Sequence, residues 1–82
     1  MEYARMTDIS AAQCRAARSL LGWRQDELEA ASDVTKKTIA DFERGARKPR
    51  AATLASLKAT LEAAGIEFIF ENGTGPGVCL RK

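Results

Sequence analysis

Basic side chains are concentrated in one stretch of this 82-residue chain, and their chemistry is the first that the sequence offers. Residues 35–50 contain six cations and only two anions, although the net charge of the whole chain is only +2. Such a cluster on a nearly neutral body is the electrostatic footprint of a phosphate-binding surface. A solvated basic loop is the alternative that charge alone leaves open. The cations are Lys36, Lys37, Arg44, Arg47, Lys48 and Arg50.

Catalytic and metal-binding chemistry has little support in the composition. The chain contains no histidine, which removes the commonest general base and the commonest zinc ligand. Its two cysteines, Cys14 and Cys79, lie far apart and show no metal-ligand spacing. They are typical of reduced, buried thiols in a cytoplasmic protein, and one disulfide is the alternative. We therefore expect no enzyme activity, no metal and no cofactor.

The length and overall composition indicate one small globular domain. Hydrophobic residues make up 45% of the chain and charged residues 29%, which favours a folded over a disordered protein. At this length the core is thin, so a partner chain would add to it. No apolar run approaches the about 18–20 residues that span a bilayer, and Met1–Asp8 lacks the features of a signal peptide. We expect no membrane association.

The basic stretch is expected to lie on a short helix and on the loop that follows it. Thr35 is a candidate N-cap, because its hydroxyl can accept a hydrogen bond from an early backbone N–H group. The helix is predicted to run through Ile39 and Phe42, which would face inward, and to stop at Gly45. Residues 36–38 would then lie in the first turn on the outer face.

Three further helices are predicted from apolar spacing and from start and stop signals. Leucines at helical spacing in residues 54–61 mark the core face of the last one. The predicted helices run from a cap at Asp8 or Ser10 to Gly22, from Gln25 to about Ala31, and from Ala51 or Ala52 to Ala64.

The composition changes after Gly65. Residues 66–70 are rich in strand-forming side chains, residues 72–77 hold three of the six glycines, and a second short strand follows at residues 78–80. We therefore predict a mainly α fold, a bundle of four to five helices with a C-terminal β-hairpin or strand extension. Residues 1–65 would form the helical part and residues 66–82 the β extension of the same domain.

Two of the predicted helices are short and separated only by the tight break Ala31–Val34. This is the helix-turn-helix plan, in which one helix crosses the nucleic-acid backbone and the next enters the major groove N-terminus first. The major groove accommodates an α-helix and presents a distinct pattern of donors and acceptors for each base pair. The sequence therefore indicates binding to duplex DNA.

Three segments of this region together resemble the phage-repressor and Cro-like helix-turn-helix family, the XRE class. They are Gln25–Ala31, Val34–Ile39 and Phe42–Pro49, within a match that covers about Cys14 to Ala64. The resemblance implies a small bacterial transcriptional regulator with a lambda-repressor-like fold. The chain departs from the family pattern at Asp33, where glycine is common because the position often has a positive φ. Aspartate tolerates this conformation better than most residues do.

The resemblance also implies a role for individual residues. Arg18 and Glu43 match a structural ion pair between the first and third helices. Gln25 matches a residue that grips a phosphate and braces the reading helix, with a plain helix-start residue as the alternative. Asp41 has an alternative as a partner of Lys37 four residues earlier. Base readout is expected from Lys36, Lys37, Thr38 and Asp41, and backbone contacts from Arg24, Gln25, Thr35, Arg44, Arg47 and Lys48.

The predicted hairpin needs something to cover its apolar face, because an isolated two-stranded hairpin is marginal in water. We expect a homodimer built around the strand at residues 66–70, since helix-turn-helix proteins gain affinity by binding two half-sites. A hairpin folded onto its own subunit is the alternative. The expected interface residues are Ile66, Phe68, Ile69, Phe70, Val78 and Leu80.

The function expected from these features is sequence-specific binding of double-stranded DNA by a dimer at a palindromic operator. Repression by blocking the polymerase is the simplest regulatory outcome. An antitoxin that binds both DNA and a toxin is one alternative. A protein-interaction adaptor without DNA binding is another.

Overall fold

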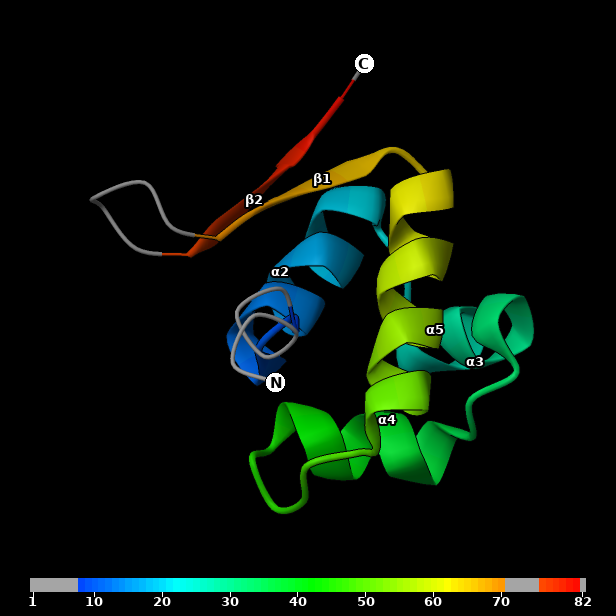
Figure 1. Cartoon of the computed structure of the whole chain (residues 1–82). Helices are drawn as coiled ribbons and strands as arrows, with labels where there is room; N and C mark the ends of the chain where they lie inside the picture. Colours follow the sequence, from blue (N-terminus) through cyan, green and yellow to red (C-terminus); the bar gives the residue numbers. More distant parts are fainter. Residues whose placement is uncertain (1–7, 71–75, 82) are drawn as a thin grey trace.

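The computed structural model describes residues 8–70 and 76–81, and within them it contains four helices followed by an antiparallel hairpin (Figure 1). The predicted mainly α fold with a C-terminal β-hairpin is confirmed. Most of the predicted turn at residues 72–77 lies outside the described residues. The elements are α2 (Ala11–Leu21), α3 (Gln25–Ser32), α4 (Lys36–Glu43), α5 (Ala51–Ala63), β1 (Ile66–Ile69) and β2 (Gly77–Leu80).

The helix boundaries follow from local chemistry. Of the two predicted caps for α2, Ser10 is the one used, because its side chain accepts from the N–H of Gln13 and the Gln13 side chain accepts from the N–H of Ser10. The Thr35 hydroxyl caps α4 by accepting from the N–H of Thr38 at 3.2 Å. Gly22 ends α2 in the left-handed conformation, with φ 71°.

One core joins the helices and the hairpin. Phe42 and Ile39 from α4, the leucines of α5 and Leu28 of α3 all point into it. The predicted inward faces are therefore correct, and α4 is held to the bundle by its inner face while its outer face stays exposed. The fully buried members are Cys14, Ala17, Leu28, Ile39, Leu57 and Leu61, each 0% exposed.

The hairpin packs onto its own helices, and this corrects part of the predicted dimer interface. Ile66 and Phe68 are only 1% and 8% exposed and belong to the core of the same chain. The prediction that these two side chains form an interface is wrong, because their own subunit already covers them. Phe70, Val78 and Leu80 are partly buried against the same core, and Ile69 is half-buried.

The two cysteines differ in environment. Cys14 is buried, as expected, but Cys79 is exposed, so the prediction that both thiols are buried is wrong for Cys79. Both are free thiols. In the strand register Cys79 lies opposite Glu67, and Phe68, whose side chain is buried, lies opposite Val78. Because side chains alternate between the faces of a strand, this register turns Cys79 outward.

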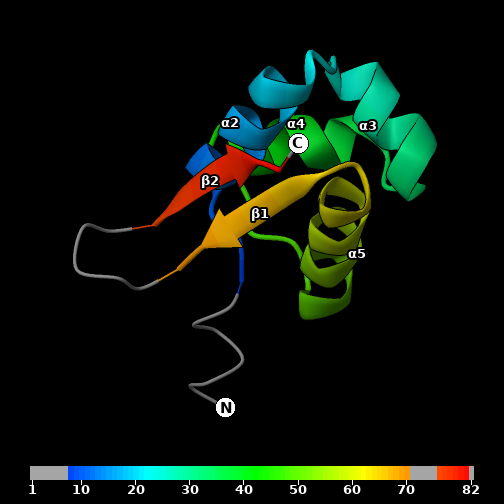
Figure 2. The same cartoon turned by 90° about the horizontal axis from the view of Figure 1, so that it is seen from above.

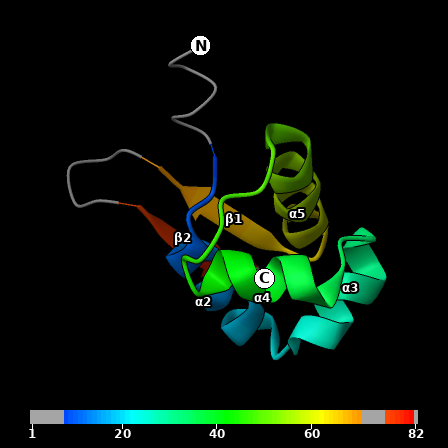
Figure 3. The same ribbon diagram turned by 90° about the horizontal axis from the view of Figure 1, so that it is seen from below.

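The hairpin and α4 lie at opposite ends of the molecule (Figure 1). Seen from above, β2 lies over α2 and β1 passes over α5 (Figure 2). Seen from below, α4 lies across the face of the molecule beside α3 (Figure 3). No helix in the described part of the chain is long and apolar enough to span a membrane.

Candidate nucleic-acid interface

Helix α4 presents its first turn to solvent. Lys36 and Lys37 are exposed and Thr38 is half-buried, while Ile39 one residue later is fully buried. The Thr38 hydroxyl accepts a hydrogen bond from the Thr35 hydroxyl at 3.0 Å, which joins the cap to the first turn. The first turn of α4 is therefore open to solvent, while the opposite face of the helix is anchored in the core.

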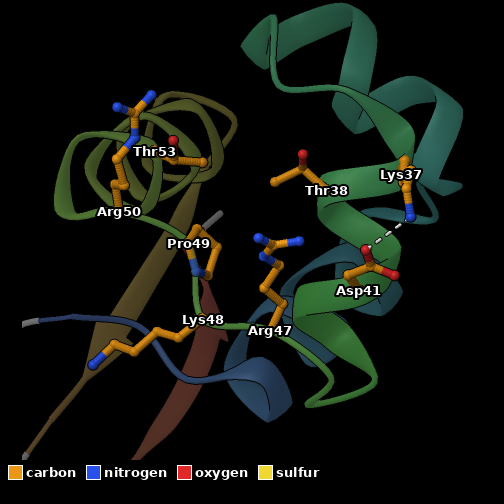
Figure 4. A pocket seen from close by; sticks show the side chains of 8 residues that line it. All are labelled: Lys37, Thr38, Asp41, Arg47, Lys48, Pro49, Arg50 and Thr53. Atoms are coloured by element: carbon orange, nitrogen blue, oxygen red, sulfur yellow. Dashed lines mark hydrogen bonds and ion pairs between the residues drawn. The ribbon is translucent and has the colours of Figure 1, made fainter.

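A groove separates α4 from the loop at residues 44–50 and the start of α5 (Figure 4). Its volume is about 450 Å³, and four of its eight lining residues are cations against a single anion. The side chain of Arg47 points into the space between α4 and α5, whereas Lys48 extends away from it (Figure 4). The lining residues are Lys37, Thr38, Asp41, Arg47, Lys48, Pro49, Arg50 and Thr53.

Asp41 is the anion of this groove, and two cations already hold it. Its carboxylate lies 2.6 Å from Nη2 of Arg44 and 3.2 Å from Nζ of Lys37. The hydrogen bonds from Arg44 and Lys37 hold the pKa of Asp41 below its usual value. In the free protein the ionised carboxylate therefore fixes both cations beside the groove, and the i,i+4 pairing with Lys37 is present.

Lys36 takes a different direction from Lys37. Its ammonium pairs with Asp26 of α3 at 2.8 Å, and its backbone N–H donates to Oε2 of Glu29. The hydrogen bond from Lys36 lowers the pKa of Asp26. Lys36 therefore ties the start of α4 to α3 and does not line the groove.

A buried carboxylate, Glu43, fixes the orientation of α4. The guanidinium of Arg18 in α2 donates two hydrogen bonds to this carboxylate, from Nε to Oε2 at 2.8 Å and from Nη2 to Oε1 at 2.7 Å. Gln25 of α3 donates to Oε1 at 3.0 Å, and the Cys14 thiol donates to Oε2 at 3.2 Å. The predicted partners Arg18 and Glu43 are thus in contact. Glu43 also contacts α3 through Gln25, the residue for which the resemblance implied a role in bracing the reading helix.

Burial and hydrogen bonding act in opposite directions on the Glu43 carboxyl. Burial by itself would raise its pKa, but the hydrogen bonds from Arg18, Gln25 and Cys14 outweigh that cost, so the pKa lies below its usual value. Burial together with the hydrogen bond to Glu43 raises the pKa of the Cys14 thiol well above its usual range. Cys14 therefore stays protonated and serves as a donor.

The remaining predicted backbone-contacting residues lie around the same face. Thr35 is exposed at the N-cap of α4, and Arg44 is exposed at its C-cap. Arg24 lies at the N-cap of α3 with a side chain 77% exposed, and it does not line the groove. The predicted site residues therefore lie in three places: along the groove, at the two ends of α4, and at the start of α3.

Sequence reasoning did not place Arg50 and Thr53 in the site. Arg50 belongs to the basic stretch, so charge was a signal for it, but Thr53 lies beyond that stretch in α5. Both reach the groove only because α5 starts beside α4, an arrangement set by tertiary packing.

Comparison with models of protein families gives a match over residues 15–63, to a family described as helix-turn-helix. The matched residues are more than half of the chain and include most of α2 and all of α3, the turn at Asp33, α4 and α5. The chain belongs to the helix-turn-helix family. It is of the XRE type, as in lambda repressor and Cro. The protein is therefore a DNA-binding regulator of transcription. A search of curated proteins gives no match.

Membership in the family assigns a role to the helices that surround the groove. Helices α3 and α4 with the turn between them are the helix-turn-helix unit, and α4 occupies the position of the reading helix. The hairpin lies beyond the matched residues, so the family match does not account for it.

Proposed function

We propose that this protein binds a specific duplex sequence as a homodimer at a palindromic operator and represses transcription by occupying the promoter. The observation that carries the proposal is the cation-lined groove along the exposed face of α4, within the helix-turn-helix unit. Cations supply affinity for phosphates, and the outer face of a helix in the major groove supplies base contacts. The proposed activity is binding, and no catalytic step is part of it.

The proposed roles divide by position on this surface. Lys37 and Thr38 read bases from the first turn of α4, with Lys36 beside them. Asp41, one turn further on, is a base reader only if phosphates draw its two cations away. The DNA backbone is held by Arg24, Gln25, Thr35, Arg44, Arg47 and Lys48.

Binding to a labelled duplex, measured by fluorescence anisotropy over a series of salt concentrations, tests the phosphate contacts. Arg47→Ala and Lys48→Ala are expected to weaken binding to all duplex sequences alike. Each lost contact should lower the slope of log affinity against log salt by about 1. This result follows because phosphate contacts act by releasing counterions and carry no sequence information.

Lys58→Gln serves as the matched control, since it removes one cation from α5 at a position outside the groove. Its salt slope should equal that of the wild type. A sequence-selective loss with an unchanged salt slope in the Arg47 and Lys48 variants would contradict the assignment. Absence of any duplex binding by the wild type would favour an adaptor that uses the fold without DNA.

Repression itself is tested by transcription from a promoter that overlaps the bound site. We expect added protein to reduce transcript in step with site occupancy, and Arg47→Ala to require a higher protein concentration for the same effect. An increase in transcript at full occupancy would contradict the repressor role.

A further inference from the structure

Neither outer edge of the two-stranded sheet has a partner strand in the described part of the chain, and the edge of β2 is the one that lies against α2. Strand β2 pairs with β1 on its other side, and Arg81 N donates to Gly65 O at 2.8 Å in the same register. Hydrogen-bonded and non-hydrogen-bonded pairs alternate in antiparallel strands, so the Cys79 pair with Glu67 is hydrogen-bonded and the Val78 and Leu80 pairs are not. The backbone N–H and C=O groups of Val78 and Leu80 therefore point to the open edge.

Helix α2 provides a floor beneath this edge. A hollow of about 180 Å³ lies between them, and Ala12 and Ala16 of α2 form its apolar part. The other lining residues are Ser10, Gln13, Pro76, Gly77 and Val78. Leu20, one further turn along the same face of α2, is 45% exposed and is the most exposed large hydrophobic side chain of the described residues. The edge thus offers backbone hydrogen bonds above and apolar contact below, which together suit an extended strand.

We infer that the occupant is β2 of a second copy of this chain, which pairs antiparallel with β2 about a two-fold axis at Cys79. In this register Val78 exchanges hydrogen bonds with Leu80 of the partner subunit, and the symmetry repeats the exchange. A register shifted toward the turn would oppose Leu80 to a proline, Pro76, which has no N–H group to donate. The two hairpins then form one continuous sheet.

The placement of α4 supports this occupant over another kind of strand. A two-fold axis relating antiparallel neighbours in one sheet runs perpendicular to that sheet. Figure 2 looks onto the sheet, and Figure 1 shows α4 at the far end of the molecule from it. The axis therefore places the α4 helices of both copies on the same side, as one face of a duplex requires.

The size of the chain agrees with this arrangement. The principal extents of the chain are 33 × 31 × 19 Å, so the centres of two copies placed side by side along a long extent lie a distance apart comparable with the about 34 Å between successive half-sites. This part of the inference rests on the proposed palindromic operator, whereas the strand pairing does not depend on DNA.

Cys79 supplies a test that needs no engineered label. At the centre of the register the two Cys79 residues form a non-hydrogen-bonded pair on the outer face, with Cβ atoms about 4.5–5.5 Å apart, close to disulfide distance. Oxidised glutathione takes up the two electrons and two protons of the paired thiols, the S–S bond forms, and two reduced glutathione molecules leave. Cys14 is buried in the core and does not compete.

The decisive comparison is sedimentation of the full chain without DNA, for the wild type, Cys79→Ser and Cys79→Lys. In the single subunit the introduced ammonium faces Glu67, so the subunit of the Lys variant should fold as that of the wild type does. Across the two-fold axis two ammonium groups would oppose each other. We expect wild type and Cys79→Ser to be dimers, and the Lys variant to have a dimer dissociation constant raised by about tenfold or more.

The outcomes separate this inference from the proposed function. A wild-type monomer at tens of micromolar, or a Lys variant that dimerises as the wild type does, would overturn the β2 interface. So would a wild-type dimer that glutathione fails to cross-link through Cys79. Loss of duplex binding in a protein that still dimerises would instead overturn the proposed function. The Lys variant should keep the wild-type affinity for a duplex carrying a single half-site.

Discussion

Glu43 shows how a residue that need not touch DNA can determine whether α4 is placed to do so. Its carboxylate accepts hydrogen bonds from side chains of α2 and α3 while it sits at the end of α4. With its side chain 3% exposed and that of Arg18 19% exposed, the pair is shielded from water. Removing one partner of such a pair strongly destabilises the fold, because it leaves the other charge buried without a counter-charge.

Glu43→Ala is therefore expected to destabilise the fold by about 3 kcal/mol, at the lower end for a broken buried pair because Arg18 keeps some access to water. Urea unfolding of Glu43→Ala, Arg18→Ala and the double variant measures this. We expect the double variant to lose less than the sum of the two single losses. Strictly additive losses would show that the two side chains do not interact.

The pH dependence of stability gives a second test at the same carboxyl. A group whose pKa is lower in the folded than in the unfolded state, where Glu has about 4.3, stabilises the fold fully above that unfolded value. The contribution is lost as the pH falls through the folded pKa. We expect thermal melting of the wild type and Glu43→Gln to differ most near pH 7 and to converge on acidification below about pH 4. A constant difference between the two would contradict a lowered pKa.

Prediction from sequence succeeded for single residues where the family pattern fixes a pair of positions. Arg18 and Glu43 were identifiable because the resemblance assigns both ends of one contact. The contact of Glu43 with Cys14 depends on how the helices meet, so no local spacing encodes it. The same reason kept Thr53 of α5 out of the predicted set of site residues.

The turn between α3 and α4 depends on one residue in the left-handed conformation. Asp33 has φ 65°, and it is the non-glycine residue with positive φ in the described segments. Left-handed geometry costs most side chains roughly 1–2 kcal/mol, and glycine avoids that cost. The sequence indicated this conformation because the family often carries glycine here.

Substitutions at Asp33 test the turn. Asp33→Gly is expected to match or exceed the wild-type stability, and Asp33→Ala to lie about 1 kcal/mol below the glycine variant. Urea denaturation provides the ranking, and DNA affinity should stay unchanged in the glycine variant because the helix positions are kept. An alanine variant as stable as the glycine variant would show that the turn does not need this conformation.

Helix boundaries were predictable because caps and stop signals act locally, as at Ser10, Thr35 and Gly22. The position of the hairpin was not, because nothing in the alternation of residues 66–70 tells whether the apolar face meets its own helices or another chain. In the folded chain, the side chains of Ile66 and Phe68 pack into the core of their own subunit. The exposure of Cys79 then follows from the strand register.

At the scale of the whole molecule, two surfaces face in opposite directions. The cationic groove lies at the α4 end, and the open strand edge lies at the hairpin end (Figure 1). Such a separation lets one chain bind a duplex and pair with a second copy without competition between the two contacts. The low net charge of +2 also means that DNA affinity depends on where the cations lie more than on their total.

The central claim is that α4 reads base sequence, and selection of bound duplexes from a random pool tests it most directly. We predict that the wild type enriches one two-fold symmetric sequence. Lys37→Ala and Thr38→Ala should each relax the preference at one position of each half-site, at a cost of about 1–3 kcal/mol per contact. Lys58→Gln, outside the groove, should enrich the wild-type sequence. Enrichment of no sequence by the wild type, or of an unchanged sequence by both α4 variants, would contradict the claim.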